Sequence, residues 1–162
     1  GLGDSVSFFL LKAPPTTGIY PLSLHDALPT SVAVLNGDTI TDETLDRLSA
    51  YHQERKSANE NHLATIMVVP MVSPYGLVDM DSSGTVTGFR EKVEMEHWIN
   101  AGIYLFDRAI AEELPELGDH ETETFPRLAQ AGRLAAMRSR SFWRSVDSFK
   151  DLNEAEEHVA SR

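Results

Sequence analysis

Two short apolar runs, separated by a stretch with helical spacing, constrain the fold more than any other feature of this sequence. Residues 32–35 and 64–70 are the apolar runs, and each has the length of a buried strand. Between them, residues 41–52 open with a capping residue and early acidic residues, and then repeat apolar side chains near helical spacing. A strand, a helix and a second strand in this order predict a parallel α/β unit.

The rest of the chain adds further strands and helices and one antiparallel excursion. Two β-prone stretches lie on either side of residues 81–84, which end in glycine and predict a hairpin turn. The expected strands are 75–81, 85–91, 98–106, 133–138 and 141–146, and the expected helices are 108–114, 121–131 and one that opens at Ser148. The predicted fold class is therefore α/β, with a mixed sheet flanked by helices.

Charge and composition exclude several classes of partner and site. The 162 residues hold 14 basic and 25 acidic side chains, a net charge of −11, which argues against a nucleic-acid or anionic-membrane surface. Phosphate-bearing small molecules stay compatible, because a divalent cation can supply positive charge. The absence of cysteine excludes a disulfide scaffold and a thiolate zinc site, and it fits a cytoplasmic protein. No apolar run approaches the length of a membrane span.

The first thirty residues differ from the remainder. They hold half of the eight prolines, and only residues 8–11 are strongly apolar, with no strand or helix period continuing from them. A secretory signal is not expected, because the run is too short, no basic segment precedes it and no small-residue cleavage site follows it. Residues 22–29 resemble the translation of a sequencing-adapter oligonucleotide, and the alternative is an ordinary proline-rich extension. We expect residues 1–30 to be a non-native or disordered tail and residues 31–162 to form one domain.

Two aspartates lie at expected strand ends, where open α/β sheets bind ligands. Asp38 directly follows the first buried strand, and Asp147 lies between the last strand and the capping residue Ser148. Mg²⁺ in proteins takes one or two carboxylates together with substrate phosphates. The alternatives are an ordinary turn at residues 36–38 and a purely capping role for Asp147.

Three further polar residues could contact a substrate. Glu91 and Lys92 end the second hairpin strand, where the first could accept sugar hydroxyls and the second could hold a phosphate. A solvated charge pair is the alternative. Asn100 precedes two small residues, Ala101 and Gly102, which would let a ligand approach the backbone, although close packing explains them equally well.

No motif of nucleophilic or metalloprotease catalysis occurs in the sequence. It contains no Gly-x-Ser-x-Gly, no Walker loop and no His-Glu-x-x-His. His120, Glu121 and Glu123 form a cluster of metal-binding residue types, but without a matched second set of ligands we expect a solvated helix start.

Five segments, taken in order, resemble the sugar-phosphate nucleotidyltransferases, and most closely their mannose-1-phosphate guanylyltransferase-like branch. The segments are residues 34–38, 73–76, 86–92, 98–104 and 142–151, and the similarity extends from Ser31 to Val159. The resemblance implies a Rossmann-like fold and a Mg²⁺-dependent transfer of a nucleotidyl group from a nucleoside triphosphate to a sugar 1-phosphate. Pyrophosphate would be released, and the product would be a nucleotide sugar such as GDP-mannose.

The resemblance also implies roles for six residues. Asp38 and Asp147 would hold Mg²⁺, Gly76, Glu91 and Asn100 would line the sugar pocket, and Lys92 would meet the sugar phosphate. One departure is Val93, which stands where the family usually has proline after Glu-Lys.

A second departure concerns the triphosphate site. The family begins with a strand and a glycine-rich loop that carries a basic residue, and residues 1–4 lack that residue. We therefore expect residues 31–162 to be the C-terminal portion of the domain, without the N-terminal nucleotide-binding part, and the chain alone to be inactive. The alternative is a non-catalytic sugar-phosphate-binding or regulatory subunit of the same fold. The sequence leaves open the nucleotide, the sugar and whether the chain forms a homo-oligomer.

Overall fold

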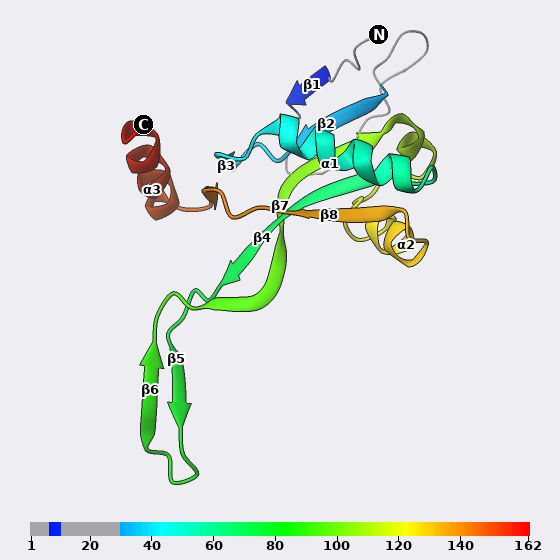
Figure 1. Ribbon diagram of the computed structural model, residues 1–162. Coiled ribbons are helices and arrows are strands. Elements are labelled where there is room, and N and C mark those ends of the chain that lie inside the picture. Colours follow the sequence, from blue (N-terminus) through cyan, green and yellow to red (C-terminus); the bar gives the residue numbers. More distant parts are fainter. Residues whose placement is uncertain (1–6, 11–29) are drawn as a thin grey trace.

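The computed structural model describes residues 7–10 and 30–162 (Figure 1). The predictions for the other residues of the N-terminal tail, including the adapter-like segment, lie outside the described residues. The described residues form a five-stranded sheet with helices on both faces, a smaller strand pair beside it and a projecting hairpin.

The main sheet is mixed, as the sequence predicts. Its order is β1 (Ser7–Leu10), β2 (Ser31–Leu35), β7 (Glu94–Asp107), β4 (Ala64–Val72) and β8 (Leu134–Arg138). Both β2 and β4 pair antiparallel with β7, which lies between them, so they run parallel to each other. Helix α1 (Leu45–Ala58) connects them, which confirms the predicted strand, helix and strand.

Strand β1 was not expected from the sequence. It pairs parallel with β2, with Phe8 opposite Ala33, and covers the edge of β2 that faces away from β7. A four-residue edge strand is held by main-chain hydrogen bonds along one side, so it needs no side-chain period that a sequence pattern could reveal.

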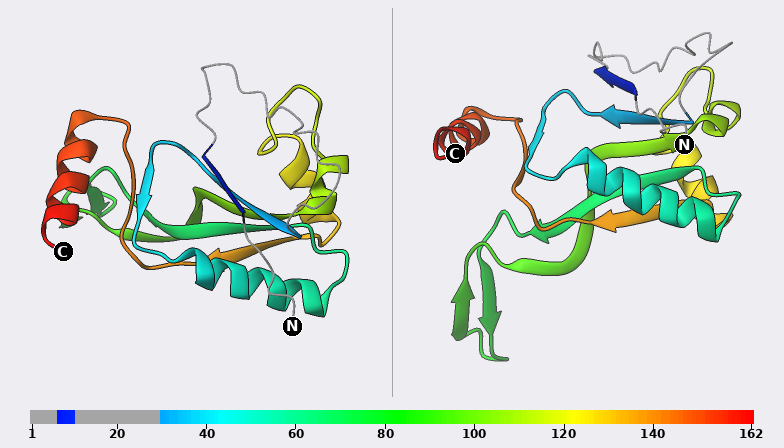
Figure 2. Two further views of the ribbon diagram at one scale, coloured as in Figure 1. Left: turned by 90° about the horizontal axis from the view of Figure 1, so that it is seen from above. Right: turned by 45° about the horizontal axis from the view of Figure 1, so that its top comes forward.

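Helices cover both faces of the sheet (Figure 2). Helix α1 packs on one face over a core of Ala33, Leu48, Met67, Val69, Ala101, Ile103, Leu105 and Met137. The 3₁₀ helix η1 (Arg108–Glu112) and α2 (Thr124–Gln130) cover the other, over Leu63, Ala64, Tyr104, Phe106, Ile110, Phe125 and Leu128. Residues 103–106 of β7 are buried on both faces of the sheet, because their side chains point alternately into the two cores.

Three smaller features complete the described chain. Strand β3 (Thr39–Thr41) pairs antiparallel with β9 (Trp143–Ser145). The predicted hairpin is confirmed as β5 (Leu77–Met80) and β6 (Val86–Arg90), and it projects away from the sheet (Figure 1). Helix α3 (Phe149–Ala160) begins after Ser148, whose side chain accepts a hydrogen bond from the Asp151 N–H at 3.3 Å, as predicted. No helix in the described ranges is long and apolar enough to cross a membrane.

The start and length of several elements differ from the sequence-based expectations. Helix α1 begins after Thr44 rather than near Thr41, because Thr41 belongs to β3 and its hydroxyl donates to the Phe142 carbonyl at 2.8 Å. Strand β7 is longer than residues 98–106, and α2 is shorter than residues 121–131. The predicted helix at residues 108–114 is the 3₁₀ helix.

Two buried histidines connect α1 to the sheet. The Thr65 hydroxyl lies 2.9 Å from both His52 Nδ1 and His62 Nε2, and all three residues are almost fully buried. Burial, reinforced by the proximity of His62, lowers the pKa of His52 to about 4. Burial also lowers the pKa of His62, so the folded protein favours two neutral rings.

This histidine pair predicts that the protein loses stability in mild acid. The unfolded chain binds a proton at His52 below pH 6.5, whereas the folded chain does so only near pH 4, so stability falls as pH decreases through that window. We expect the free energy of unfolding to drop by about 2 kcal/mol between pH 7 and pH 5. Urea denaturation at several pH values measures it. His52→Asn should flatten the dependence, and His97→Gln, at an exposed position, should not.

Candidate functional site

A large bulge in β7 creates the first part of the candidate site. Ile66 of β4 lies opposite Tyr104, and Val68 lies opposite Asn100, so two steps along β4 match four steps along β7. The extra residues surround Gly102, whose φ of +71° is a conformation that side chains rarely adopt. Bulges of this kind bend a strand and re-aim its side chains.

The loop after β2 packs directly against this bulge. The Asn36 N–H donates to the Gly102 carbonyl at 2.8 Å. A Cβ at Gly102 would come within 2.6 Å of Asn36 Nδ2, so the loop can approach only because this residue is glycine. Gly102 therefore has two structural requirements, its backbone angle and its missing side chain.

Strand β9 brings the second aspartate to the same place. Trp143 Nε1 donates to the Ala101 carbonyl at 2.9 Å, which attaches β9 to the bulge. The Val146 N–H donates to the Asp38 carbonyl at 2.8 Å, so the main chains of Asp38 and Asp147 lie beside each other. We call residues 36–38, 100–102 and 143–147 the strand-end site, because it lies where the parallel strands β2, β4 and β8 reach their carboxyl ends.

The two aspartates have the chemistry of a magnesium site. Both side chains are exposed, and the Thr39 hydroxyl is 3.4 Å from Asp38 Oδ1. Within residues 7–10 and 30–162, no group of three or more histidine, cysteine, aspartate or glutamate residues could hold a metal ion. Two carboxylates still fit Mg²⁺, because this ion usually keeps several waters and takes its other ligands from substrate phosphates.

Asn100 belongs to a hydrogen-bond network at the bulge. Its Nδ2 lies 2.9 Å from the Tyr104 hydroxyl and 3.0 Å from Glu121 Oε1, and its Oδ1 accepts from the Gly102 N–H at 3.0 Å. The Tyr104 hydroxyl in turn donates to Glu121. Burial raises the pKa of Tyr104, and the hydrogen bond to Glu121 adds to this effect, so the phenol stays protonated and remains a donor.

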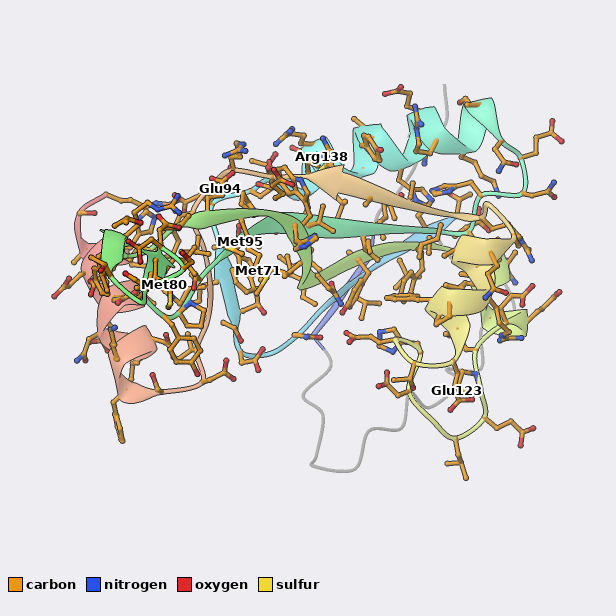
Figure 3. All side chains as sticks on the ribbon, turned by 90° about the horizontal axis from the view of Figure 1, so that it is seen from below. Met71, Met80, Glu94, Met95, Glu123 and Arg138 are labelled. Atoms are coloured by element: carbon orange, nitrogen blue, oxygen red, sulfur yellow. The ribbon has the colours of Figure 1, made fainter. Side chains whose placement is uncertain are left out.

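The other three predicted residues form a separate group at the base of the hairpin. Gly76 and Glu91 adjoin the terminal pair of the hairpin, Leu77 and Arg90, and Lys92 follows with a φ of +52°. All three predicted residues are exposed. Between this group and Asn100, residues Glu94 and Asn100 lie opposite Val72 and Val68 of β4, which are up to about 13 Å apart, so the two groups lie at different levels of the sheet. Figure 3 shows Met80 of the hairpin and Glu123 at opposite ends of the molecule.

Gly76 lies beside the Phe89 ring. A Cβ at this position would come within 2.6 Å of the tip of that ring, but the ring is 61% exposed and can move aside, so this contact does not by itself require glycine. The predicted contact of Gly76 with a sugar stays a prediction.

Sequence reasoning missed the role of Glu121. The helix start expected at residues 120–123 comes too early, because α2 begins only at Thr124. Glu121 and Glu123 are exposed, as expected, but Glu121 also bonds to Asn100 and Tyr104. His120 is largely buried and packs edge-on against Tyr104, with ring centroids 5.4 Å apart. No local pattern could have indicated these contacts, since they join residues 17 and 21 positions apart.

Comparisons with known proteins decide the family. A family model described as nucleotidyl transferase matches residues 21–162. The chain belongs to this family. A Drosophila pseudoobscura pseudoobscura protein named mannose-1-phosphate guanylyltransferase catalytic subunit beta is 33% identical over 135 residues, which cover 80% of this chain and 35% of the relative. A Bacillus subtilis protein named probable glucose-1-phosphate cytidylyltransferase is 31% identical over 120 residues, covering 73% of this chain and 45% of the relative.

A solved structure of the same fold supports the architecture. It is a Bacillus anthracis protein with a provisional assignment as a glucose-1-phosphate thymidylyltransferase, and it superposes with a TM-score of 0.54 at 16% identity. The superposition covers 80% of this chain and 55% of that protein. The Rossmann-like fold that the resemblance implied is thus confirmed, and this member of the family spans less than half the length of the two relatives above.

The dual requirement at Gly102 gives a prediction for the strand-end site. Gly102→Ala should destabilise the protein by about 2–3 kcal/mol, because it combines a strained backbone with a clash against Asn36. Gly132→Ala is the matched control, since Gly132 has a φ of +67° but nothing within 4 Å of its Cβ position. We expect it to cost only about 1 kcal/mol. Thermal unfolding of both variants measures the difference, and equal costs would contradict the role of the Asn36 contact.

Proposed function

We propose that this chain carries the metal-binding and sugar-binding part of a sugar-1-phosphate nucleotidyltransferase. The proposed reaction moves a nucleotidyl group from a nucleoside triphosphate to a sugar 1-phosphate and releases pyrophosphate. The observation that supports it most is the pairing of β3 with β9, which puts Asp38 and Asp147 side by side at the strand ends. The name of the Drosophila relative favours a guanylyl group and a product such as GDP-mannose.

The proposed roles follow from the chemistry of each side chain. Asp38 and Asp147 would hold Mg²⁺, which neutralises phosphate charge and orients the phosphates when it is bound. Lys92 would attract the sugar phosphate as a point charge. Glu91 and Asn100 would bind sugar hydroxyls, and Gly76 would leave room for the ring. The reaction needs no nucleophile from the protein, since positioning and charge stabilisation supply most of the catalysis of phosphoryl-type transfer.

The acidic character of the chain makes the metal central to this proposal. A chain with a net charge of −11 repels a sugar phosphate and a triphosphate at long range. A divalent cation held by the two aspartates reverses the sign of the local charge. The net charge of −11 favours small phosphorylated substrates over nucleic acid as ligands. The absence of cysteine fits a cytoplasmic protein.

Metal binding is predicted to depend on both aspartates. Asp38→Asn and Asp147→Asn should each weaken Mn²⁺ binding by about tenfold or more, because each removes one of two charged ligands. Electron paramagnetic resonance titration of the purified chain with Mn²⁺ measures the affinity, and competition with Mg²⁺ identifies the same site. Asp46→Asn, at an exposed position in the first turn of α1, is the control. An unchanged affinity in either site variant removes that residue from the metal site.

Substrate binding tests the function itself. We expect the chain to bind α-mannose 1-phosphate more tightly with Mg²⁺ than without it, and Lys92→Ala to weaken this binding. Isothermal titration calorimetry measures both effects. A chain that binds neither α-mannose 1-phosphate nor α-glucose 1-phosphate contradicts the proposed function.

A further inference from the structure

Glu121 reaches the strand-end site from a distant part of the chain. It lies in the loop before α2, and its Oε1 contacts Asn100 Nδ2 at 3.0 Å and the Tyr104 hydroxyl. The loop is held in place, since the Glu121 N–H donates to Asp119 Oδ1 at 2.8 Å and the Thr124 hydroxyl donates to the Glu113 carbonyl at 3.0 Å. A charged side chain is thereby fixed against the Asn100 amide of the site.

These contacts determine which way the Asn100 amide faces. Its oxygen accepts from the Gly102 N–H, and its nitrogen faces the Glu121 carboxylate. In the opposite orientation, the amide nitrogen would meet the Gly102 N–H, so that two donors would face each other. The amide oxygen would then meet the carboxylate, so that two acceptors would face each other. Glu121 and Gly102 together therefore allow only one orientation.

The network leaves Asn100 with free hydrogen-bonding capacity of a particular kind. Tyr104 Oη and Glu121 Oε1 are themselves in hydrogen-bond contact, so one N–H of the amide points between them and serves both. A second N–H and one lone pair of Oδ1 remain. A hydroxyl can both donate and accept, so it matches this pair, whereas a phosphate oxygen only accepts and would face the repelling Oδ1.

We propose that Glu121 is a positioning residue, which orients the Asn100 amide so that it receives a sugar hydroxyl rather than the phosphate. The proposal rests on the proposed function for the identity of the ligand, but the orientation of the amide does not. Tyr104 completes the arrangement, because it accepts from Asn100 while donating to Glu121. Its side chain is completely buried, so the hydroxyl cannot turn to water instead.

The orientation is tested first, without a ligand. In ¹H–¹⁵N NMR spectra, assigned with Asn100→Asp, the side-chain amide of Asn100 should give two well-separated proton signals, one of them protected from exchange with water. Glu121→Gln should reduce the protection, because the charged acceptor of the N–H is replaced by a neutral amide, whose oxygen accepts more weakly and whose nitrogen does not accept. Tyr104→Phe, which keeps the buried ring, should reduce it in part. Glu123→Gln, two residues away, is the control and should leave both signals unchanged (Figure 3).

Ligand binding is tested next, with two probes. Glu121→Gln should weaken the binding of α-mannose 1-phosphate about fivefold to tenfold, as expected for the loss of one oriented hydrogen bond. The same variant should leave the binding of inorganic phosphate unchanged, since the phosphate contacts Lys92 and the metal. Calorimetric titration of the wild type, Glu121→Gln and Glu123→Gln with each probe gives the comparison.

The outcomes separate this proposal from the proposed function. If the Asn100 signals are the same in the wild type and in both Glu121→Gln and Tyr104→Phe, the positioning role is overturned. Equal weakening of both probes also overturns it, because it would indicate a general loss of structure or charge. If the amide is released in Glu121→Gln but the wild type binds no sugar phosphate, the positioning role is supported and the proposed function fails.

Discussion

The bulge of β7 at Gly102 is the constraint on which the candidate site depends. The positive φ of Gly102 bends the strand, and its missing side chain admits the loop that carries Asn36 and Asp38. The same bulge supplies the Ala101 carbonyl that holds Trp143, and hence the strand before Asp147. It also lets the Tyr104 hydroxyl reach Asn100, although the two residues are four positions apart in a strand. One backbone irregularity thus positions both aspartates and the amide.

The sheet can tolerate this irregularity because its packing beyond the bulge is regular. From Ile103 onward, β7 alternates side chains between two apolar cores, one under α1 and one under α2. Pairing with β2 and β4 on either side fixes its register there, since a slip of one residue would exchange the two faces. The regular half of β7 therefore anchors the half that contributes to the strand-end site, and the apolar pattern of β7 stops at Asn100.

The sequence predicted those parts of the fold that local patterns determine. The buried strands, the hairpin turn at Gly84 and the cap at Ser148 each follow from a few neighbouring residues, and so did the position of Asp38 at a strand end. Strand β1 was missed because a short edge strand shows no period. The bulge was missed because it is a mismatch of register between two strands, and Glu121 because its contacts arise only when α2 packs on the sheet.

The position of the hairpin places a geometric condition on the proposed site. Lys92 and Glu91 lie at the hairpin base, and Glu94 and Asn100 of β7 lie opposite Val72 and Val68 of β4, which are up to about 13 Å apart. A small ligand held by Asn100 at its hydroxyls and by Lys92 at its phosphate must bridge that separation. The hairpin projects from the sheet (Figure 1), but residues 94–100 stay paired with β4, Ile99 packs against the core under α1, and Glu94 forms an ion pair with Arg140. A second shift of register already shortens this separation, because the two steps from Pro70 to Val72 on β4 match the four steps from Trp98 to Glu94 on β7.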